Sequence, residues 1–176
     1  MKDEIFGDKV ILRPLREEDA AFFAQWCSNP RIMFECGLHE AATLEKELER
    51  IRKPEEGDRD WYAVTDMSGR LVGEVGLLRI WPHWHCTDMS IIIPNPADRG
   101  KGYGGDAVRL ILARAFFHYN MNRVAIGVVG ANTQAIAFYE KIGFKKEGIQ
   151  EQGYFYNNSF SDFVMMRMLK SEYRYT

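Results

Sequence analysis

The sequence has few cysteines and no long hydrophobic run, and both shortages narrow its class. Its 176 residues contain three cysteines, and no two of them form a Cys-x-x-Cys pair. An odd count without that spacing argues against a disulfide framework and a structural zinc site, so we expect free thiols and no metal. No apolar stretch approaches the roughly 20 residues that cross a bilayer. Charged residues stand in the first ten positions, where a signal peptide would be apolar. We therefore expect a soluble cytoplasmic protein without a membrane partner.

The sequence also lacks an excess of positive charge. Lys and Arg total 23 against 25 Asp and Glu, which gives a net charge of −2. Proteins that bind nucleic acid usually carry a basic excess, so we expect no nucleic-acid partner. A hydrophobic share of 46% and a charged share of 27% are ordinary for a globular protein. At roughly 150 residues per domain, the length predicts a single domain over residues 1–176.

Hydrophobic periodicity predicts a mixed α/β domain. We expect a helix that starts after Asp19 and breaks at Asn29-Pro30, and an amphipathic helix with a solvated face over 43–53, capped by Thr43 and ended by Pro54 and Gly57. The remaining expected helices are 104–119 and 132–142. Expected strands are 9–15, 60–66, 71–80, 86–93, 123–129 and two tail strands around the turn at Asn157-Asn158.

The strongest local signal is the run Arg-Gly-Lys-Gly-Tyr-Gly-Gly at 99–105, which follows a strand and opens a helix. Glycine lets a ligand approach the backbone closely. Free N–H groups at a helix N-terminus, together with the helix dipole, favour a phosphate group. The run therefore predicts a site for a phosphorylated cofactor, and the alternative is a glycine-rich turn that only caps the helix.

Two nucleotide-binding motifs fit this run poorly. Gly100, Gly102 and Gly105 match G-x-G-x-x-G, but that pattern indicates a dinucleotide only after the first strand of a βαβ unit with an acid further on. Here the loop follows an antiparallel-looking meander, and the stretch 123–130 holds no acid. The Walker A pattern does not occur in the sequence.

Arg-Gly-x-Gly-x-Gly between a strand and a helix resembles the acyl-coenzyme-A loop of the GCN5-related N-acetyltransferase (GNAT) superfamily. The opening VILRPLREEDAAFFAQWCSNPRI resembles the ribosomal-protein-alanine and spermidine N-acetyltransferase branch. The stretch Asp88-Met-Ser-Ile-Ile-Ile is similar to the fourth strand of that branch. The stretch Asn132-x-x-Ala-Ile-x-x-Tyr139-Glu-Lys-x-Gly-Phe is similar to a later segment of the same branch. The matches run from about residue 10 to about residue 169.

The resemblance implies a mostly antiparallel mixed sheet that is splayed at the acyl-coenzyme-A site and flanked by helices. It implies an acetyl-coenzyme-A-dependent N-acetyltransferase that needs no metal. The pantetheine arm would pair with the backbone of Ile91, Ile92 and Ile93, which is sheet-edge pairing, and would contact the Asn132 side chain. The alternative role of Asn132 is a plain helix N-cap. The pyrophosphate would lie on the loop formed by Arg99, Gly100, Lys101, Gly102, Tyr103, Gly104 and Gly105.

The implied reaction is direct attack of an amine on the thioester through a tetrahedral intermediate. Tyr139 resembles the tyrosine that protonates the departing thiolate, which a phenol can do. Backbone N–H groups around Ile91 would polarise the carbonyl. Candidates for the base are Asp88 and Glu74, with His83 and His85 as further candidates. Asp88 stands where relatives often have Glu, so its shorter side chain would need a water relay.

The acceptor amine is open between a protein N-terminus, a polyamine and another small amine. Aromatic and acidic side chains would suit a cationic amine, and the sequence offers Trp26, Phe34, Glu35, Trp81, Trp84, Tyr154, Phe155 and Tyr156. The second hypothesis for the whole chain is a sensor that binds an acyl-coenzyme A without turnover. Tail strands that pair across two copies would build a homodimer.

Overall fold

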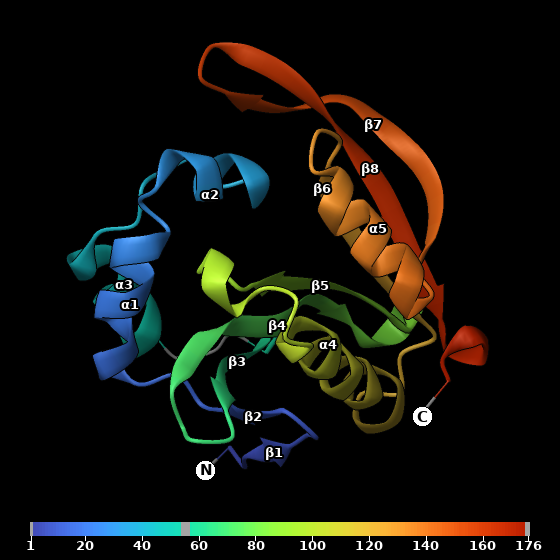
Figure 1. Cartoon of the computed structure of the whole chain (residues 1–176). Coiled ribbons are helices and arrows are strands. Elements are labelled where there is room, and N and C mark those ends of the chain that lie inside the picture. The colour runs from blue at the N-terminus through green and yellow to red at the C-terminus, as the bar shows by residue number, and fades with distance from the viewer. Residues whose placement is uncertain (1, 54–56, 175–176) are drawn as a thin grey trace.

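One twisted sheet organises the chain (Figure 1). The computed structural model describes residues 2–53 and 57–174. Within them the sheet has eight strands in the order β1-β2-β3-β4-β5-β6-β8-β7, and only β5 and β6 pair in parallel. This confirms a mixed, mostly antiparallel sheet. The strands are β1 Ile5–Phe6, β2 Val10–Arg13, β3 Asp60–Asp66, β4 Leu71–Trp81, β5 Cys86–Ile92, β6 Arg123–Val129, β7 Lys145–Tyr156 and β8 Ser159–Leu169.

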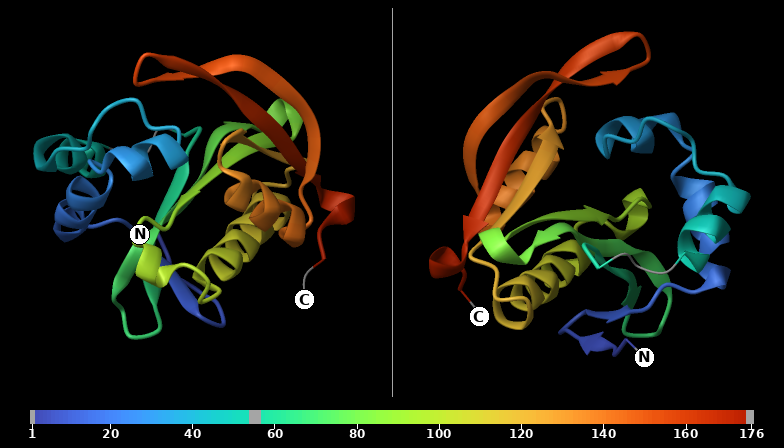
Figure 2. Two further views of the ribbon diagram at one scale, coloured as in Figure 1. Left: turned by 45° about the horizontal axis from the view of Figure 1, so that its top comes forward. Right: turned by 180° about the vertical axis from the view of Figure 1, so that it is seen from behind.

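Helices form two groups on the sheet, and the views of Figure 2 show α1, α2 and α3 together, apart from α4 and α5. The helices are α1 Ala20–Trp26, α2 Pro30–Glu35, α3 Leu44–Arg52, α4 Tyr103–Ala113 and α5 Thr133–Ile142. Buried side chains of α4 and α5 form the main core with β2, β3, β4 and β6. Phe23 of α1 and Cys27, the residue after α1, form a smaller cluster with Ile92 of β5. The sheet is therefore covered by a different helix group at each of these clusters.

Most predicted elements are confirmed, including the strands 60–66 and 123–129 and the cap of α3 by Thr43. Asn157 and Asn158 form the predicted turn, with positive φ values of 48° and 57°. The prediction for Asn29-Pro30 was incomplete. These residues end one helix but begin α2, because the Asn29 side chain accepts from the N–H of Arg31 and Pro30 takes the first helical position.

The prediction missed one strand and misplaced the end of one helix. Strand β1 was not expected, because two residues carry no readable periodicity. Helix α4 ends at Ala113 and continues as a π-helical turn over Arg114–His118. Pro54, the expected end of α3, lies outside the described residues.

Strands β5 and β6 separate part-way along their length. They pair from Cys86 with Arg123 to Asp88 with Ala125, and in the described chain no later residue of β5 pairs with β6. β6 instead pairs along its whole length with β8, and β5 pairs with β4 as far as Ile92. The backbone of β5 beyond Asp88 therefore has an edge that the sheet does not use.

The N-terminal turn of α4 is fixed to β2 by Asp106. Its buried carboxylate accepts hydrogen bonds from the N–H groups of Lys9 (2.7 Å) and Val10 (3.1 Å) and also pairs with Arg109 (2.6 Å). Backbone donors of β2 would otherwise be left unpaired at this contact, which costs more than the bond itself contributes. Asp106 therefore positions the helix start that follows the glycine loop.

We expect Asp106→Ala to lower the free energy of unfolding by about 2–3 kcal/mol, because two backbone donors lose a charged acceptor. Asp8→Ala is the matched control, since Asp8 also pairs with Arg109 but its side chain is 81% exposed. That change should cost less than about 1 kcal/mol, as exposed ion pairs do. Urea unfolding measures both, and equal losses would contradict the anchoring role.

Candidate functional site

A cavity of about 730 Å³ lies where β5 leaves β6, beside the start of α4 and one face of α5. We call it the loop cavity. Most residues predicted to bind the cofactor line it, from three separate parts of the chain. These are Ile91, Ile92, Ile93, Arg99, Gly100, Gly102, Gly104, Gly105 and Asn132, together with Tyr139. Lys101 and Tyr103 were predicted with them but do not line the cavity, and their binding role stays a prediction.

The loop has a conformation that favours glycine. Gly100 and Gly102 have φ values of +77° and +89°, in the left-handed region that side chains rarely adopt. Gly102 precedes the first residue of α4, and the first hydrogen bond of the helix runs from Asp106 N–H to the Gly102 carbonyl. The N–H groups between them have no partner within the helix, and with the helix dipole they suit an anion.

Ion pairs hold this loop in place. Asp98 accepts from Arg70 through both oxygens, at 2.9 and 3.0 Å, and pairs with Lys101 at 3.1 Å. The Arg70 guanidinium holds the pKa of Asp98 below its usual range. Arg99 donates to the Ile93 carbonyl and pairs with Glu35 of α2 at 2.9 Å. The loop is therefore tied both to the sheet and to α2.

Asn132 and Tyr139 lie two turns apart on α5, and both line the loop cavity. The side-chain Oδ1 atom of Asn132 accepts from Ala135 N–H at 3.1 Å, and its Nδ2 group donates to the Glu35 carbonyl at 2.9 Å. The N-cap role is therefore confirmed. Tyr139 is only 5% exposed, and its hydroxyl has no hydrogen-bond partner among the described residues. Burial raises the pKa of Tyr139, so the phenol keeps its proton and can donate it.

A second cavity, of about 990 Å³, lies between α1, α3 and the strands β3, β4 and β5. We call it the α3 cavity. Ile92 lines both cavities, so they meet at the end of β5. Its lining includes Phe23, Glu47, Arg50, Trp61, Glu74 and Ile92.

Glu74 is the buried carboxylate of the α3 cavity. It accepts from Arg50 at 3.0 Å, and its β4 position pairs with Ile92 across the sheet. Burial raises the pKa of Glu74, and the Arg50 guanidinium opposes that rise. The nearby thiols of Cys27 and Cys36 stay neutral, because burial raises their pKa values to about 12 and about 11. Glu74 is therefore a basic carboxylate close to the meeting point of the cavities.

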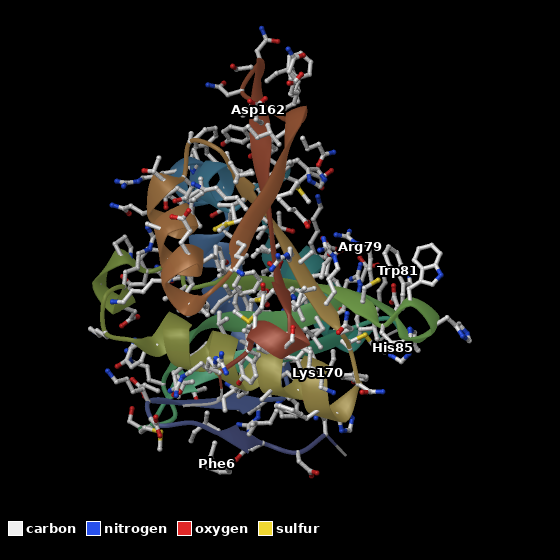
Figure 3. All side chains as sticks on the ribbon, turned by 90° about the vertical axis from the view of Figure 1, so that its right-hand side faces the viewer. Phe6, Arg79, Trp81, His85, Asp162 and Lys170 are labelled. Atoms are coloured by element: carbon white, nitrogen blue, oxygen red, sulfur yellow. The ribbon has the colours of Figure 1, made fainter. Side chains whose placement is uncertain are left out.

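The other predicted bases lie away from both cavities. Asp88 pairs with Arg79 at 2.5 Å and lines neither one. His83 is exposed, and the Nδ1 atom of His85 lies 2.8 Å from the Asn120 carbonyl. Figure 3 shows Arg79, Trp81 and His85 together at the same end of the molecule. The structure therefore brings only Glu74, of the four, to a cavity.

Several aromatic candidates for the acceptor pocket join α2 to the tail hairpin instead. The Tyr154 hydroxyl donates to the Leu38 carbonyl at 3.0 Å, and the Tyr156 hydroxyl donates to the Pro30 carbonyl at 3.3 Å. The Phe34 ring packs against both tyrosine rings. In Figure 1 the β7–β8 hairpin arches toward α2. None of these three aromatics lines either cavity, nor do Trp26, Trp81, Trp84 and Phe155, whereas Glu35 lines the loop cavity.

Sequence reasoning missed Glu47 and Arg50, because it treated the polar side of α3 as solvated. Their side chains are 13% and 35% exposed and pair at 2.6 Å. The readable signal was their spacing of three residues, which puts both on one helix face.

No helix of the described residues is long and apolar enough to cross a membrane.

The family described as "Acetyltransferase (GNAT) domain" matches residues 9–145. The spermidine N(1)-acetyltransferase of Vibrio cholerae is 29% identical over 95% of this chain and 96% of its own length. The probable N-acetyltransferase YjcK of Bacillus subtilis is 28% identical over 94% and 97%. The solved structure of spermidine N-acetyltransferase from Vibrio cholerae with CoA and spermine is 27% identical, has a TM-score of 0.82, and covers 93% of this chain and 97% of its own.

We expect Gly102→Val to weaken acetyl-coenzyme-A binding by more than about tenfold, because a side chain is strained at this φ value. Its Cβ would also lie 2.8 Å from the Lys9 ammonium. Calorimetric titration measures the affinity, and circular dichroism checks the fold. Gly148→Val is the control, since no atom lies within 4 Å of its added Cβ and it lines neither cavity. Unchanged affinity in Gly102→Val would remove the loop from the binding site.

Proposed function

The chain belongs to the GNAT acetyltransferase family, and from this premise we propose that it transfers the acetyl group of acetyl-coenzyme A to a primary amine held in the α3 cavity. One observation carries the proposal. Two cavities lie on either side of β5 and meet at Ile92, with Tyr139 in one and Glu74 in the other. A proton donor and a proton acceptor therefore flank the same short piece of backbone.

The loop cavity fits the parts of acetyl-coenzyme A. The unpaired N–H groups at the start of α4 suit its pyrophosphate. The free edge of β5, from Ser90 to Ile92, offers backbone groups to the two amides of the pantetheine arm, as an added strand would. An arm that runs along this edge would bring the thioester to Ile92, where the α3 cavity begins. The acetyl-coenzyme A supplies the activated acyl group and the thiolate leaving group.

The residues of the chain then move the protons. An ammonium of pKa about 10.4 is almost fully charged at neutral pH and must lose a proton before it can attack. Glu74 accepts that proton, directly or through a water molecule. The amine nitrogen bonds to the thioester carbon, and backbone N–H groups near Ile91 stabilise the negative charge on its oxygen. The carbon–sulfur bond then breaks, and Tyr139 donates its hydroxyl proton to the thiolate. The second proton of the attacking nitrogen, released as the amide forms, restores the phenol.

A sensor without turnover would need only the loop cavity. A buried carboxylate with an opposed phenol has no role in such a sensor, so the arrangement favours the enzyme. The named relatives include spermidine N-acetyltransferases, and an amine acceptor is consistent with them. The single domain over residues 1–176 and the homodimer stay predictions.

We expect Tyr139→Phe to lower turnover by about 10- to 1000-fold, because the thiolate then leaves without its proton donor. Acetyl-coenzyme-A affinity should stay near that of the wild type. Release of free thiol with an acceptor amine measures turnover. Tyr156→Phe is the control, because its hydroxyl donates to the Pro30 carbonyl and it lines neither cavity. Wild-type turnover in Tyr139→Phe would exclude the acid role.

We expect kcat/KM to fall at low pH with an apparent pKa above the ordinary glutamate value of about 4.3. Burial raises the pKa of Glu74, and below that pKa the protonated carboxyl cannot accept a proton. Glu74→Gln should be slow and should lack this acidic limb, whereas Asp88→Asn should keep it. The reverse pattern in the two pH profiles would transfer the base role to Asp88.

A further inference from the structure

Three charged side chains form one cluster in the α3 cavity. The Arg50 guanidinium donates to Glu47 at 2.6 and 2.9 Å and to Glu74 at 3.0 Å. The side chains of Glu47, Arg50 and Glu74 are 13%, 35% and 7% exposed. With both carboxylates ionised, two negative charges share one positive charge. The cluster therefore has room for one further positive charge and no more.

The other carboxylates of the α3 cavity are already matched. Glu40 pairs with Lys46 at 2.5 Å, and Glu49 pairs with Lys53 at 2.9 Å. All four side chains are more than half exposed. Among the described lining residues, no carboxylate outside the Arg50 cluster is without a cation. A second ammonium group in the cavity would therefore meet lysines and arginines rather than a free acid.

Apolar side chains form part of the remaining wall. The Phe23 ring lies under the Arg50 guanidinium at 5.4 Å, and Leu15, Leu38 and Ile92 line the same space. Trp61 covers Gly76 so closely that a Cβ there would lie 2.3 Å from its ring. An uncharged hydrocarbon chain suits these walls, whereas a charged group would lose its hydration there without gaining a partner, which costs free energy.

We propose that Arg50 is a specificity-determining residue, which limits the acceptor to an amine with one positive charge and an apolar remainder and disfavours polyamines. This rests on the proposed function. By neutralising one of the two buried carboxylates, Arg50 leaves a net charge that a single ammonium balances. This preference separates the chain from the relatives that are named spermidine N-acetyltransferases.

The groups that face Glu74 fix the charge count. From α3 these are Glu47 and Arg50, and from β3 the uncharged indole of Trp61. The residues that follow α1 and α2 add the neutral thiols of Cys27 and Cys36. Assaying both amines at one fixed pH keeps the protonation state of the enzyme the same in the two measurements. The comparison then reports the acceptor's charge rather than a change in the enzyme's own charge.

The test compares pentylamine with butane-1,4-diamine, which have equal length and differ by a methyl group against an ammonium group. Thiol release gives kcat/KM for each. We expect the wild type to prefer pentylamine by about tenfold or more, since an unmatched like charge is costly. Arg50→Gln should lose most of this preference, and Arg50→Lys should keep it. A ratio within one variant cancels any general loss of activity.

Arg16→Gln is the control, because this exposed arginine pairs with Glu18 and lines neither cavity. It should keep the wild-type ratio. A wild type that prefers the diamine, or an Arg50→Gln ratio equal to the wild type, overturns the proposal while the proposed function stands.

Absence of thiol release with every amine, from folded protein that binds acetyl-coenzyme A, overturns the proposed function instead. Calorimetric binding of the two amines to the coenzyme-A-loaded protein then decides the charge preference. Tighter binding of pentylamine that Arg50→Gln abolishes supports it, and equal binding of both amines overturns it.

Discussion

The separation of β5 from β6 after Asp88 is the constraint on which the rest of the molecule depends. The backbone N–H and C=O groups of a strand inside a sheet bond to the neighbouring strands, whereas those of an edge strand stay available to a ligand or another chain. Here the edge lies inside the molecule, because β6 goes on with β8 and the chain that leaves β5 turns through Pro94 and Pro96 into the glycine loop. The gap creates the loop cavity, and the end of β5 is its border with the α3 cavity.

A free backbone edge and a glycine-rich loop do not hold their own positions, so other contacts must fix them. Asp106 ties the start of α4 to β2, and Asp98 ties the loop to Arg70 at the end of the β3–β4 turn. Both carboxylates are buried and fully paired. These contacts remove freedom that a ligand would otherwise have to remove on binding, which is the physical basis of preorganisation.

The sequence was informative wherever the signal was local. The glycine run could be predicted because its conformation needs glycine, whereas the roles of Asn132 and Tyr139 were assigned from the resemblance of their segment to the GNAT superfamily. The choice between Asp88 and Glu74 could not be made, because both lie on adjacent strands and only the register decides. That register pairs Glu74 with Ile92 but pairs Asp88 with Leu78, further from the meeting point of the cavities. Arg50 was out of reach for the same reason, since its partner Glu74 is 24 residues away.

Burial raises the pKa values of both Tyr139 and Glu74, with different consequences for the two groups. In the loop cavity it keeps the Tyr139 phenol protonated, so this group can only give a proton. In the α3 cavity it makes Glu74 more basic, so this group takes a proton more readily than an exposed carboxylate would. Burial alone would also leave Glu74 uncharged over too wide a pH range, and Arg50 opposes this. A guanidinium suits that role, because it stays charged in any protein environment and its planar donors reach two carboxylates at once. In the mechanism that we propose, Glu74 therefore takes a proton in one cavity and Tyr139 gives a proton in the other.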